Sequence, residues 1–517
     1  MLWRRLTICA VLMGVLLALP FYFRKEEGVT PVADDAETLV VITSHNKAVR
    51  DEYQIAFRKY YKEKYGKDIR IDFRSPGGTS DIMRYLDDQY TTAFRRYYEK
   101  NHGSWDNAYV KIFKDGRQNG HAVRQAFLNS DVGIGIDIFA GGGTFNMQET
   151  ARCGFAVDGG VKERHPEYFK PESIPETFGG EMLYDPQGRY YGVVLSTFGI
   201  LYNIDRIKEM GGEPPLRWHD LGDGRFFNAI VLADPTKSGS ANKCFEIMIQ
   251  QCMADAKDPA KGWYDGFNLL KRLFGNARAV TDSASKVVRD VGQGEAAAGT
   301  AIDTYGFAEI AWSKRCFDGK SKVNYVTPKG GTAVSADPVQ ILRGAPNRRA
   351  AEAFVDFLLS IEGQKLHAYK AGIPGGGVKS SPSRPAIRKE LYAPEHRDKL
   401  FEADYDPYAS GADFTYRPKW TGRYYSLIRV VIKSLMLDCQ QELHAAWQAI
   451  VAAGGPEKVP EAMEYFNKLP FTYNEAADVA QKLKKGTPVE AAQMVRRWSD
   501  FARENYIKAE KLAREGK

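Results

Sequence analysis

The 517-residue sequence lacks the short motifs of the well-known catalytic families. It contains no GxSxG nucleophile elbow, no HExxH metal-binding helix and no phosphate-binding P-loop, and residue order alone reveals no Ser/His/Asp arrangement. The carboxylate pair Asp87 and Asp88 falls on a predicted helix, which is typical of a solvated face. We therefore expect a protein that is not an enzyme. A secreted hydrolase with dispersed catalytic residues remains as the enzymatic alternative.

Cysteine is scarce, with six residues in the whole chain, and none of them forms a CxxC pair. Their distances from the histidines do not match a zinc site, so the sequence indicates no resident metal and no cofactor. Five cysteines lie beyond the N-terminal region, at positions 153, 244, 252, 316 and 439. Their spacing establishes no disulfide, and buried free thiols are an equally good interpretation.

Long runs of basic residues are also absent. No stretch of five or more Lys or Arg occurs, and the net charge of +7 is small for a chain of this length. This pattern argues against a nucleic-acid partner and fits a small anionic ligand or anionic lipid nearby.

The N-terminal region, residues 1–37, resembles a signal peptide or membrane anchor followed by a linker. Arg4 and Arg5 precede 18 residues without charge, Leu6–Phe23. This length is at the lower limit for spanning a bilayer. The small-residue cleavage pattern is poor, because Ala18 is followed by Leu19 and Pro20. We expect a periplasmic protein that is tethered to the inner membrane by this segment.

Beyond the linker, the pattern of apolar residues alternates between strands and helices. A β-branched run at Thr38–Thr43 is followed by an amphipathic segment, and a second strand at Ile69–Phe73 is followed by another helix. Such alternation predicts an α/β fold with a parallel sheet. The length implies more than one domain. We expect a first lobe at residues 38–145 and 333–400, a second lobe at 146–332, and an α-rich C-terminal extension at 401–517.

Several predicted strands end in a short turn rich in Ser, Thr and Gly that opens a helix. The N–H groups and dipole of such a helix start attract an anion, and the hydroxyl groups add hydrogen-bond donors. Ordinary helix capping is the alternative for each single turn. The residues that we expect at a ligand cleft for this reason are Ser44, His45, Gly78, Thr79, Ser80, Gly143, Thr144, Ser238 and Ser240.

The order of these segments resembles the bacterial extracellular solute-binding proteins of ABC importers, in the group that serves ferric iron, thiamine, phosphonates and sugar phosphates. The resemblance implies a type II periplasmic-binding fold, with two lobes joined by crossing strands and a ligand in the cleft between them. It also implies an importer permease as a partner and no covalent chemistry. The matching segments are 39–46, 75–82, 137–142, 191–194, 201–203, 233–235, 337–339 and 345–347.

Ferric members of this family use an adjacent tyrosine pair, often with a histidine from the first strand turn. Here the corresponding stretch reads Asp303-Thr304-Tyr305-Gly306, so only Tyr305 remains. The resemblance therefore favours a small phosphorylated, phosphonate or carboxylate ligand, held by His45, Thr197, Asp303 and Tyr305 in addition to the turns. A metal site with His45 and Tyr305 is the minority alternative, and a further one is that Tyr305 packs at the hinge while His45 caps its helix. A ferric-binding protein and a non-transport sensor or scaffold are the rival functions.

Overall fold

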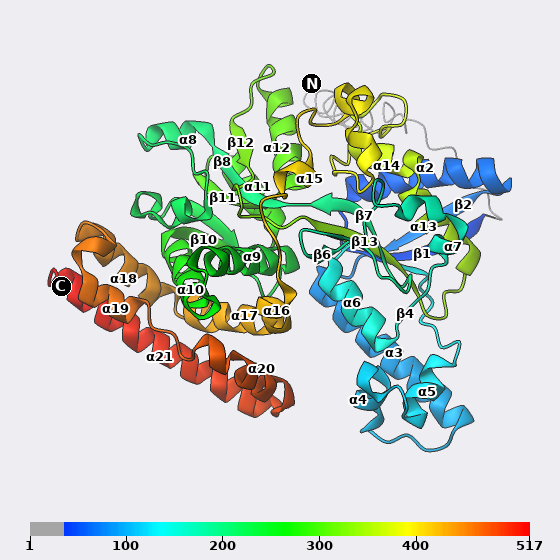
Figure 1. Ribbon diagram of the computed structural model, residues 1–517, viewed down its shortest axis with the longest axis horizontal. Helices are drawn as coiled ribbons and strands as arrows, with labels where there is room; N and C mark the ends of the chain where they lie inside the picture. The colour runs from blue at the N-terminus through cyan, green and yellow to red at the C-terminus, as the bar shows by residue number, and fades with distance from the viewer. Residues whose placement is uncertain (1–35) are drawn as a thin grey trace, which may run out of the picture.

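Two β-sheets lie side by side in the computed structural model, which describes residues 36–517 (Figure 1). Helices cover the faces of both sheets, so the expected two-lobed α/β architecture is confirmed. The expected signal peptide or anchor lies outside the described residues, apart from the end of its linker. Within the described part, no helix is long and apolar enough to cross a membrane.

The first sheet combines parallel strands from the start of the chain with one antiparallel strand from its middle. β1 pairs in parallel with β2 and β3, and β13 runs antiparallel to β3, β4 and β7. The strands are β1 (Glu37–Thr43), β2 (Ile69–Arg74), β3 (Ile138–Ala140), β4 (Ala156–Val157), β7 (Tyr191–Ser196) and β13 (Ser335–Leu342). A separate hairpin is formed by β5 (Thr177–Phe178) and β6 (Glu181–Met182).

The second sheet has the order β10-β9-β11-β8-β12. β9 pairs in parallel with β10 and β11, and β8 runs antiparallel to β11 and β12. The bounds are β8 (Phe198–Asn203), β9 (Ile230–Ala233), β10 (Ala277–Thr281), β11 (Ala298–Ile302) and β12 (Val323–Val326).

The helices follow the strands in the alternating pattern that the sequence predicts near the N-terminus. The helices before β13 are α2 (Lys47–Tyr65), α3 (Thr79–Asn101), α4 (Tyr109–Lys114), α5 (Ala122–Leu128), α6 (Thr144–Cys153), α7 (Val161–Arg164), α8 (Ile204–Glu209), α9 (Gly239–Ala256), α10 (Pro259–Asn276), α11 (Ala284–Gly292) and α12 (Asp303–Cys316). Those after it are α13 (Arg348–Leu359), α14 (Ile361–Ala368), α15 (Pro407–Ser410), α16 (Pro418–Thr421), α17 (Tyr425–Ile432), α18 (Gln440–Ala452), α19 (Pro460–Phe466), α20 (Ala476–Lys485) and α21 (Pro488–Arg514).

The chain crosses between the sheets where β7 leads into β8, at Ser196 and Thr197, and returns where β12 leads to β13. The expected start of the second segment of the first lobe is residue 333, and β13 begins at Ser335. The outward crossing comes later than the expected boundary at residue 145, because β4 and β7 both pair with β13 in the first sheet. The order of elements along the chain does not reveal this pairing, which depends on β13.

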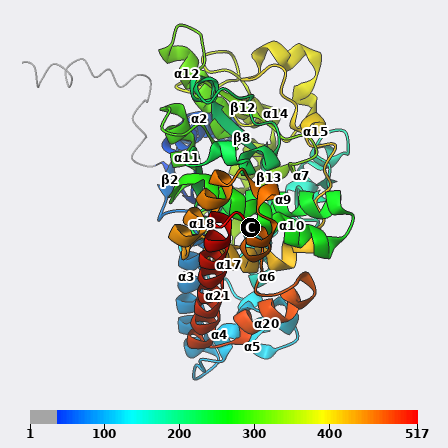
Figure 2. The same cartoon turned by 90° about the vertical axis from the view of Figure 1, so that its left-hand side faces the viewer.

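The C-terminal helices lie beside the second lobe (Figure 2), and one continuous apolar core joins them to it. α18 packs against α10, and α21 packs against α18 and α19. Buried polar contacts reinforce this packing. The indole N–H of Trp447 donates to Asn276 at 2.6 Å, and the ammonium group of Lys271 donates to the carbonyl oxygens of Phe466 and Lys468 at 2.9 and 2.7 Å. The C-terminal helices therefore complete the second lobe.

Candidate ligand-binding site

A cavity of about 560 Å³ lies between the two lobes, and residues from both sheets contribute to its walls. Ser196 from the end of β7 and Phe198 from the start of β8 line it where the chain crosses, and Ser335 and Asp337 line it on β13. The cavity therefore lies beside the crossing strands, within the range of volumes typical of small-molecule sites.

Five helices that each follow a strand of one of the two sheets begin at this cavity. The cap or first turn of each helix supplies lining residues. The backbone N–H groups of these first turns, which have no acceptor within the helix, therefore surround the same cavity. The N-terminal ends also carry the positive ends of the helix dipoles. The lining residues of this kind are Ser44, His45 and Asn46 before α2, Thr79 of α3, Gly143 and Thr144 at α6, Gly239 and Ser240 of α9, and Thr304 and Tyr305 of α12.

Seven of the twelve residues expected at the cleft line this cavity: Ser44, His45, Thr79, Gly143, Thr144, Ser240 and Tyr305. The remaining five, which do not line it, are Gly78, Ser80, Thr197, Ser238 and Asp303. Ser238 caps α9 by accepting the N–H of Ala241 at 3.2 Å. Thr197 and Asp303 are buried and joined to each other, since the N–H of Thr197 donates to the Asp303 carboxylate at 2.9 Å.

His45 belongs to a buried hydrogen-bond chain at the first lobe. Its Nε2 lies 2.9 Å from the Asp337 carboxylate, which also forms an ion pair with Arg384. Arg384 donates in turn to the hydroxyl of Tyr53 at 3.2 Å. Burial lowers the pKa of His45 well below its usual value, and the nearby charge of Arg384 lowers it further. The imidazole is therefore neutral at pH 7, and the Arg384 charge is balanced by Asp337.

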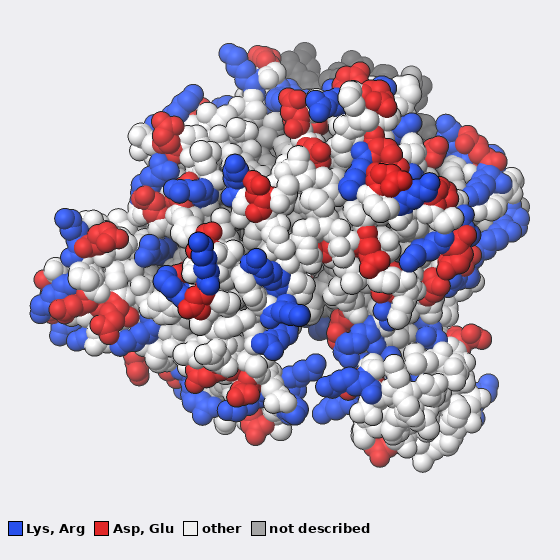
Figure 3. All heavy atoms as spheres, viewed as in Figure 1, with Lys and Arg blue, Asp and Glu red and all other residues white. Residues whose placement is uncertain are grey.

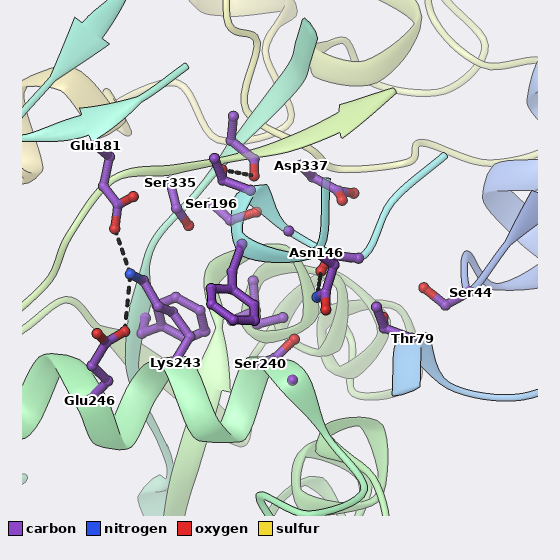
Figure 4. A pocket seen from close by; sticks show the side chains of 18 of the residues that line it. Ser44, Thr79, Asn146, Glu181, Ser196, Ser240, Lys243, Glu246, Ser335 and Asp337 are labelled. Carbon is purple, nitrogen blue, oxygen red and sulfur yellow. Dashed lines mark hydrogen bonds and ion pairs between the residues drawn. The ribbon is translucent and has the colours of Figure 1, made fainter. Parts of the chain in front are cut away.

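A second charged cluster lies at the other end of the cavity (Figure 4). The ammonium group of Lys243 on α9 lies 2.6 Å from the carboxylate of Glu181 on β6 and 3.2 Å from that of Glu246. Burial opposes the charge of Lys243, but the two carboxylates raise its pKa well above the usual value. The cation is thus fully compensated by Glu181 and Glu246. Figure 4 shows Ser44 and Thr79 far from this cluster.

The residues that the sequence interpretation missed are of two kinds. Asp337 falls in one of the segments that resemble the solute-binding family, and an acidic residue on a strand near the hinge was a usable signal. Glu181, Lys243, Tyr416 and Tyr425 also line the cavity. The sequence pattern offers no signal for these four, because their positions depend on how distant segments meet.

The lining residues include hydroxyl groups, amides and compensated charges, which suit hydrogen bonding more than metal coordination. Among residues 36–517, no group of three or more His, Cys, Asp and Glu side chains is arranged to hold a metal ion. His45 and Tyr305 do line the same cavity, and burial raises the pKa of the Tyr305 phenol. A raised pKa disfavours the phenolate form that ferric iron prefers.

Comparisons with known proteins agree with this geometry. Residues 160–391 match the model of the family described as "Bacterial extracellular solute-binding protein". A Haemophilus influenzae protein named only as uncharacterized is 31% identical over 237 residues, which is 45% of this chain and 60% of that protein. The phosphoglycerate transport regulatory protein PgtC of Salmonella typhimurium is 27% identical over 176 residues, 34% of this chain and 40% of PgtC. The chain thus spans less than two thirds of either relative.

Among solved structures, apo ferric ion-binding protein A of Pasteurella haemolytica superposes with a TM-score of 0.50 at 12% identity, covering 77% of this chain and 97% of that one. This likeness concerns the fold, and it agrees with the two lobes and crossing strands described above. The expected type II periplasmic-binding fold is confirmed. Residues 160–391 form part of that fold, and this part of the chain is similar to the bacterial extracellular solute-binding proteins.

Proposed function

We propose that the protein is the extracytoplasmic solute-binding component of an ABC importer, and that it closes on a small organic anion without transforming it. The observation that carries this proposal is the meeting of five helix N-termini at one cavity between the lobes. Because the N–H groups and dipoles of helix starts favour negative charge, their convergence favours a phosphate, phosphonate or carboxylate group.

Two of the cationic side chains that line the cavity already have carboxylate partners. Arg384 and Lys243 are balanced by their own carboxylate partners, so an anion would be held mainly by helix starts and hydroxyl groups. Basic side chains also gather along the gap below the cleft, between α20 and α4 (Figure 3). α20 carries exposed Lys482, Lys484 and Lys485. Such a positive surface attracts anionic solutes by long-range steering.

The name of the relative PgtC refers to phosphoglycerate, which carries both a phosphate and a carboxylate group. That name also includes the word regulatory, and this favours a sensor as the second candidate function. We further propose that the lobes work in the periplasm, tethered to the inner membrane by the apolar segment at residues 6–23, and dock on an importer permease. Fractionation of cells, followed by alkaline extraction of the membranes, tests the tether.

A thermal-shift screen of inorganic phosphate, organic phosphates, phosphonates, carboxylates and ferric salts tests the ligand class. A ligand at one hundred times its dissociation constant stabilises the folded protein by about 2.7 kcal/mol, which is a measurable shift. We expect an organic anion to give such a shift, and Ser240→Ala to reduce it. Ser285→Ala, an exposed serine on α11, is the matched control. A shift with ferric salts alone would favour the iron-binding alternative.

Uptake and signalling separate the transport proposal from the sensor alternative. If the protein is a transport component, deletion of its gene abolishes uptake of the ligand found in the screen. If it is a sensor, uptake persists and the cell loses only its transcriptional response to that ligand.

A further inference from the structure

The chain crosses between the lobes a third time, in a segment that lies outside the family match at residues 160–391. At its start, the Tyr408 hydroxyl donates to the carbonyl oxygen of Ile387 in the first lobe at 2.6 Å. Farther along, the N–H of Tyr416 donates to the carbonyl oxygen of Gly179 at 2.7 Å, next to the β5–β6 hairpin. The segment then enters α16 and α17 on the second lobe. We call residues 411–425 the third wall.

The third wall reaches the cavity itself. Tyr416, Arg423 and Tyr425 all line it. The ring of Tyr425 lies against that of Phe145 on α6, with centroids 4.5 Å apart, and its hydroxyl donates to the carbonyl oxygen of Gly239 on α9 at 2.8 Å. Tyr425 therefore contacts both lobes at two of the helix starts that surround the cavity.

The cluster around Lys243 fastens the third wall to both lobes. The Lys243 ammonium lies 3.5 Å from the centre of the Tyr416 ring, and the Tyr416 hydroxyl donates to Glu246 at 2.8 Å. Glu181 comes from the first lobe, whereas Lys243 and Glu246 come from the second. Because its cation is committed to these partners, Lys243 acts as a positioning residue for Tyr416.

We propose that the third wall determines the specificity of the cavity. The helix starts around the cavity suit an anionic group, while Tyr425 and Phe145 present aromatic surface to the remainder of the ligand. A cavity of about 560 Å³ is also much larger than a lone phosphate ion requires. The ligand class is therefore an organic anion whose carbon skeleton packs on the third wall. This inference rests on the proposed function for its anionic part.

Inorganic phosphate and phenyl phosphate are suitable probes, because they share a phosphate group and differ by one ring. We expect calorimetry to show that the wild-type protein prefers phenyl phosphate over inorganic phosphate, and that Tyr425→Ala reduces this preference by about 3- to 10-fold. Tyr425→Phe keeps the ring and should keep the preference. Tyr264→Ala on α10, a partly exposed tyrosine that does not line the cavity, is the matched control. An unchanged preference in Tyr425→Ala would overturn the proposal.

A second measurement needs no ligand and separates this proposal from the proposed function. Hydrogen exchange of the unliganded protein reports whether residues 411–425 are fastened to both lobes. We expect Lys243→Met to accelerate exchange in residues 411–425 and 177–182 together, and Phe145→Ala, which truncates an exposed side chain, to accelerate it around Tyr425. If neither variant changes exchange in residues 411–425, the third wall is not held by these contacts and the inference fails. If exchange changes as expected but neither probe binds, the proposed phosphate ligand is wrong, whereas the contacts that hold the third wall to both lobes are supported.

Discussion

Tyr405 donates its phenolic O–H to the carboxylate of Asp303 across 2.8 Å, and so joins the stretch just before the third crossing to the first residue of α12. Burial raises the pKa of Asp303 to about 6, although its hydrogen-bond donors lower it. The folded state therefore holds a proton that the unfolded chain releases near pH 4. The stability that this proton contributes is present at low pH and is lost as the pH rises through about 6.

Tyr405→Phe removes one donor from this carboxylate. We expect the free energy of unfolding to fall by about 1–3 kcal/mol, and to fall more at pH 8 than at pH 5, because the ionised carboxylate depends more on its donors. Denaturant titrations at the two pH values measure the difference. Tyr408→Phe is a matched control, since that hydroxyl donates to a backbone carbonyl group. An equal loss at both pH values for Tyr405→Phe would contradict the assignment.

Two adjacent glycines at the start of α6 allow the stability cost of backbone strain to be measured apart from the cost of a steric clash. Gly142 and Gly143 both have positive φ, +98° and +78°. A Cβ at Gly142 would lie 2.7 Å from Cγ2 of Thr79, whereas a Cβ at Gly143 would meet no atom of residues 36–517 within 4 Å. We expect both alanine variants to lose stability, and Gly142→Ala to lose about 1–3 kcal/mol more than Gly143→Ala. Similar thermal unfolding midpoints for the two variants would show that Thr79 moves aside without cost.

Lys271 is buried between the second lobe and the C-terminal helices, and burial lowers its pKa to about 7. In the unfolded chain this lysine keeps its proton up to about pH 10. The unfolded state therefore binds more protons than the folded state above pH 7, so the contribution of Lys271 to stability rises with pH. We expect this rise to be about 2 kcal/mol between pH 7 and 9. Lys271→Met should lack it, and parallel pH profiles for wild type and variant would refute the prediction.

His367 gives a dependence of the same sign at acid pH. Its ring lies edge-on to that of Tyr53, and burial, followed by the charge of His45, lowers its pKa to about 3. The stability associated with the neutral ring is present above pH 6.5 and is lost as the pH falls toward 3. We expect His367→Phe to weaken this acid sensitivity by roughly 3–5 kcal/mol over that range. The check is the thermal unfolding midpoint of both proteins at pH 7, 5.5 and 4.

The sequence predicts the first two strands and the two helices after them well, because their sequence patterns involve only neighbouring residues. The β-branched run at 38–43 and the strand at 69–73 coincide with β1 and β2, and the helix starts after them follow from caps such as Asn46. Much of the candidate site has the same origin, since Ser44, Thr79 and Ser240 stand at turns that can be read from neighbouring residues.

What the sequence does not reveal depends on contacts between distant segments. β7 joins the first sheet only because β13 returns beside it, so the boundary expected at residue 145 misses that strand. Tyr416 and Tyr425 enter the cavity because the third crossing passes the β5–β6 hairpin, and no periodicity indicates that meeting. In the same way, Trp447 has the pattern of an ordinary buried helix residue, and its bond to Asn276 is a property of the packed core.

The shared core of the second lobe and the C-terminal helices has a consequence for biosynthesis. Both lobes are assembled from separate stretches of chain, and the second cannot bury Trp447 or Tyr506 until the last helix has emerged. A nascent chain that stops near residue 400 would expose the apolar side of α10, which invites aggregation. Completion of the second-lobe core therefore requires α18–α21, which are synthesised long after the sheet that they help to bury.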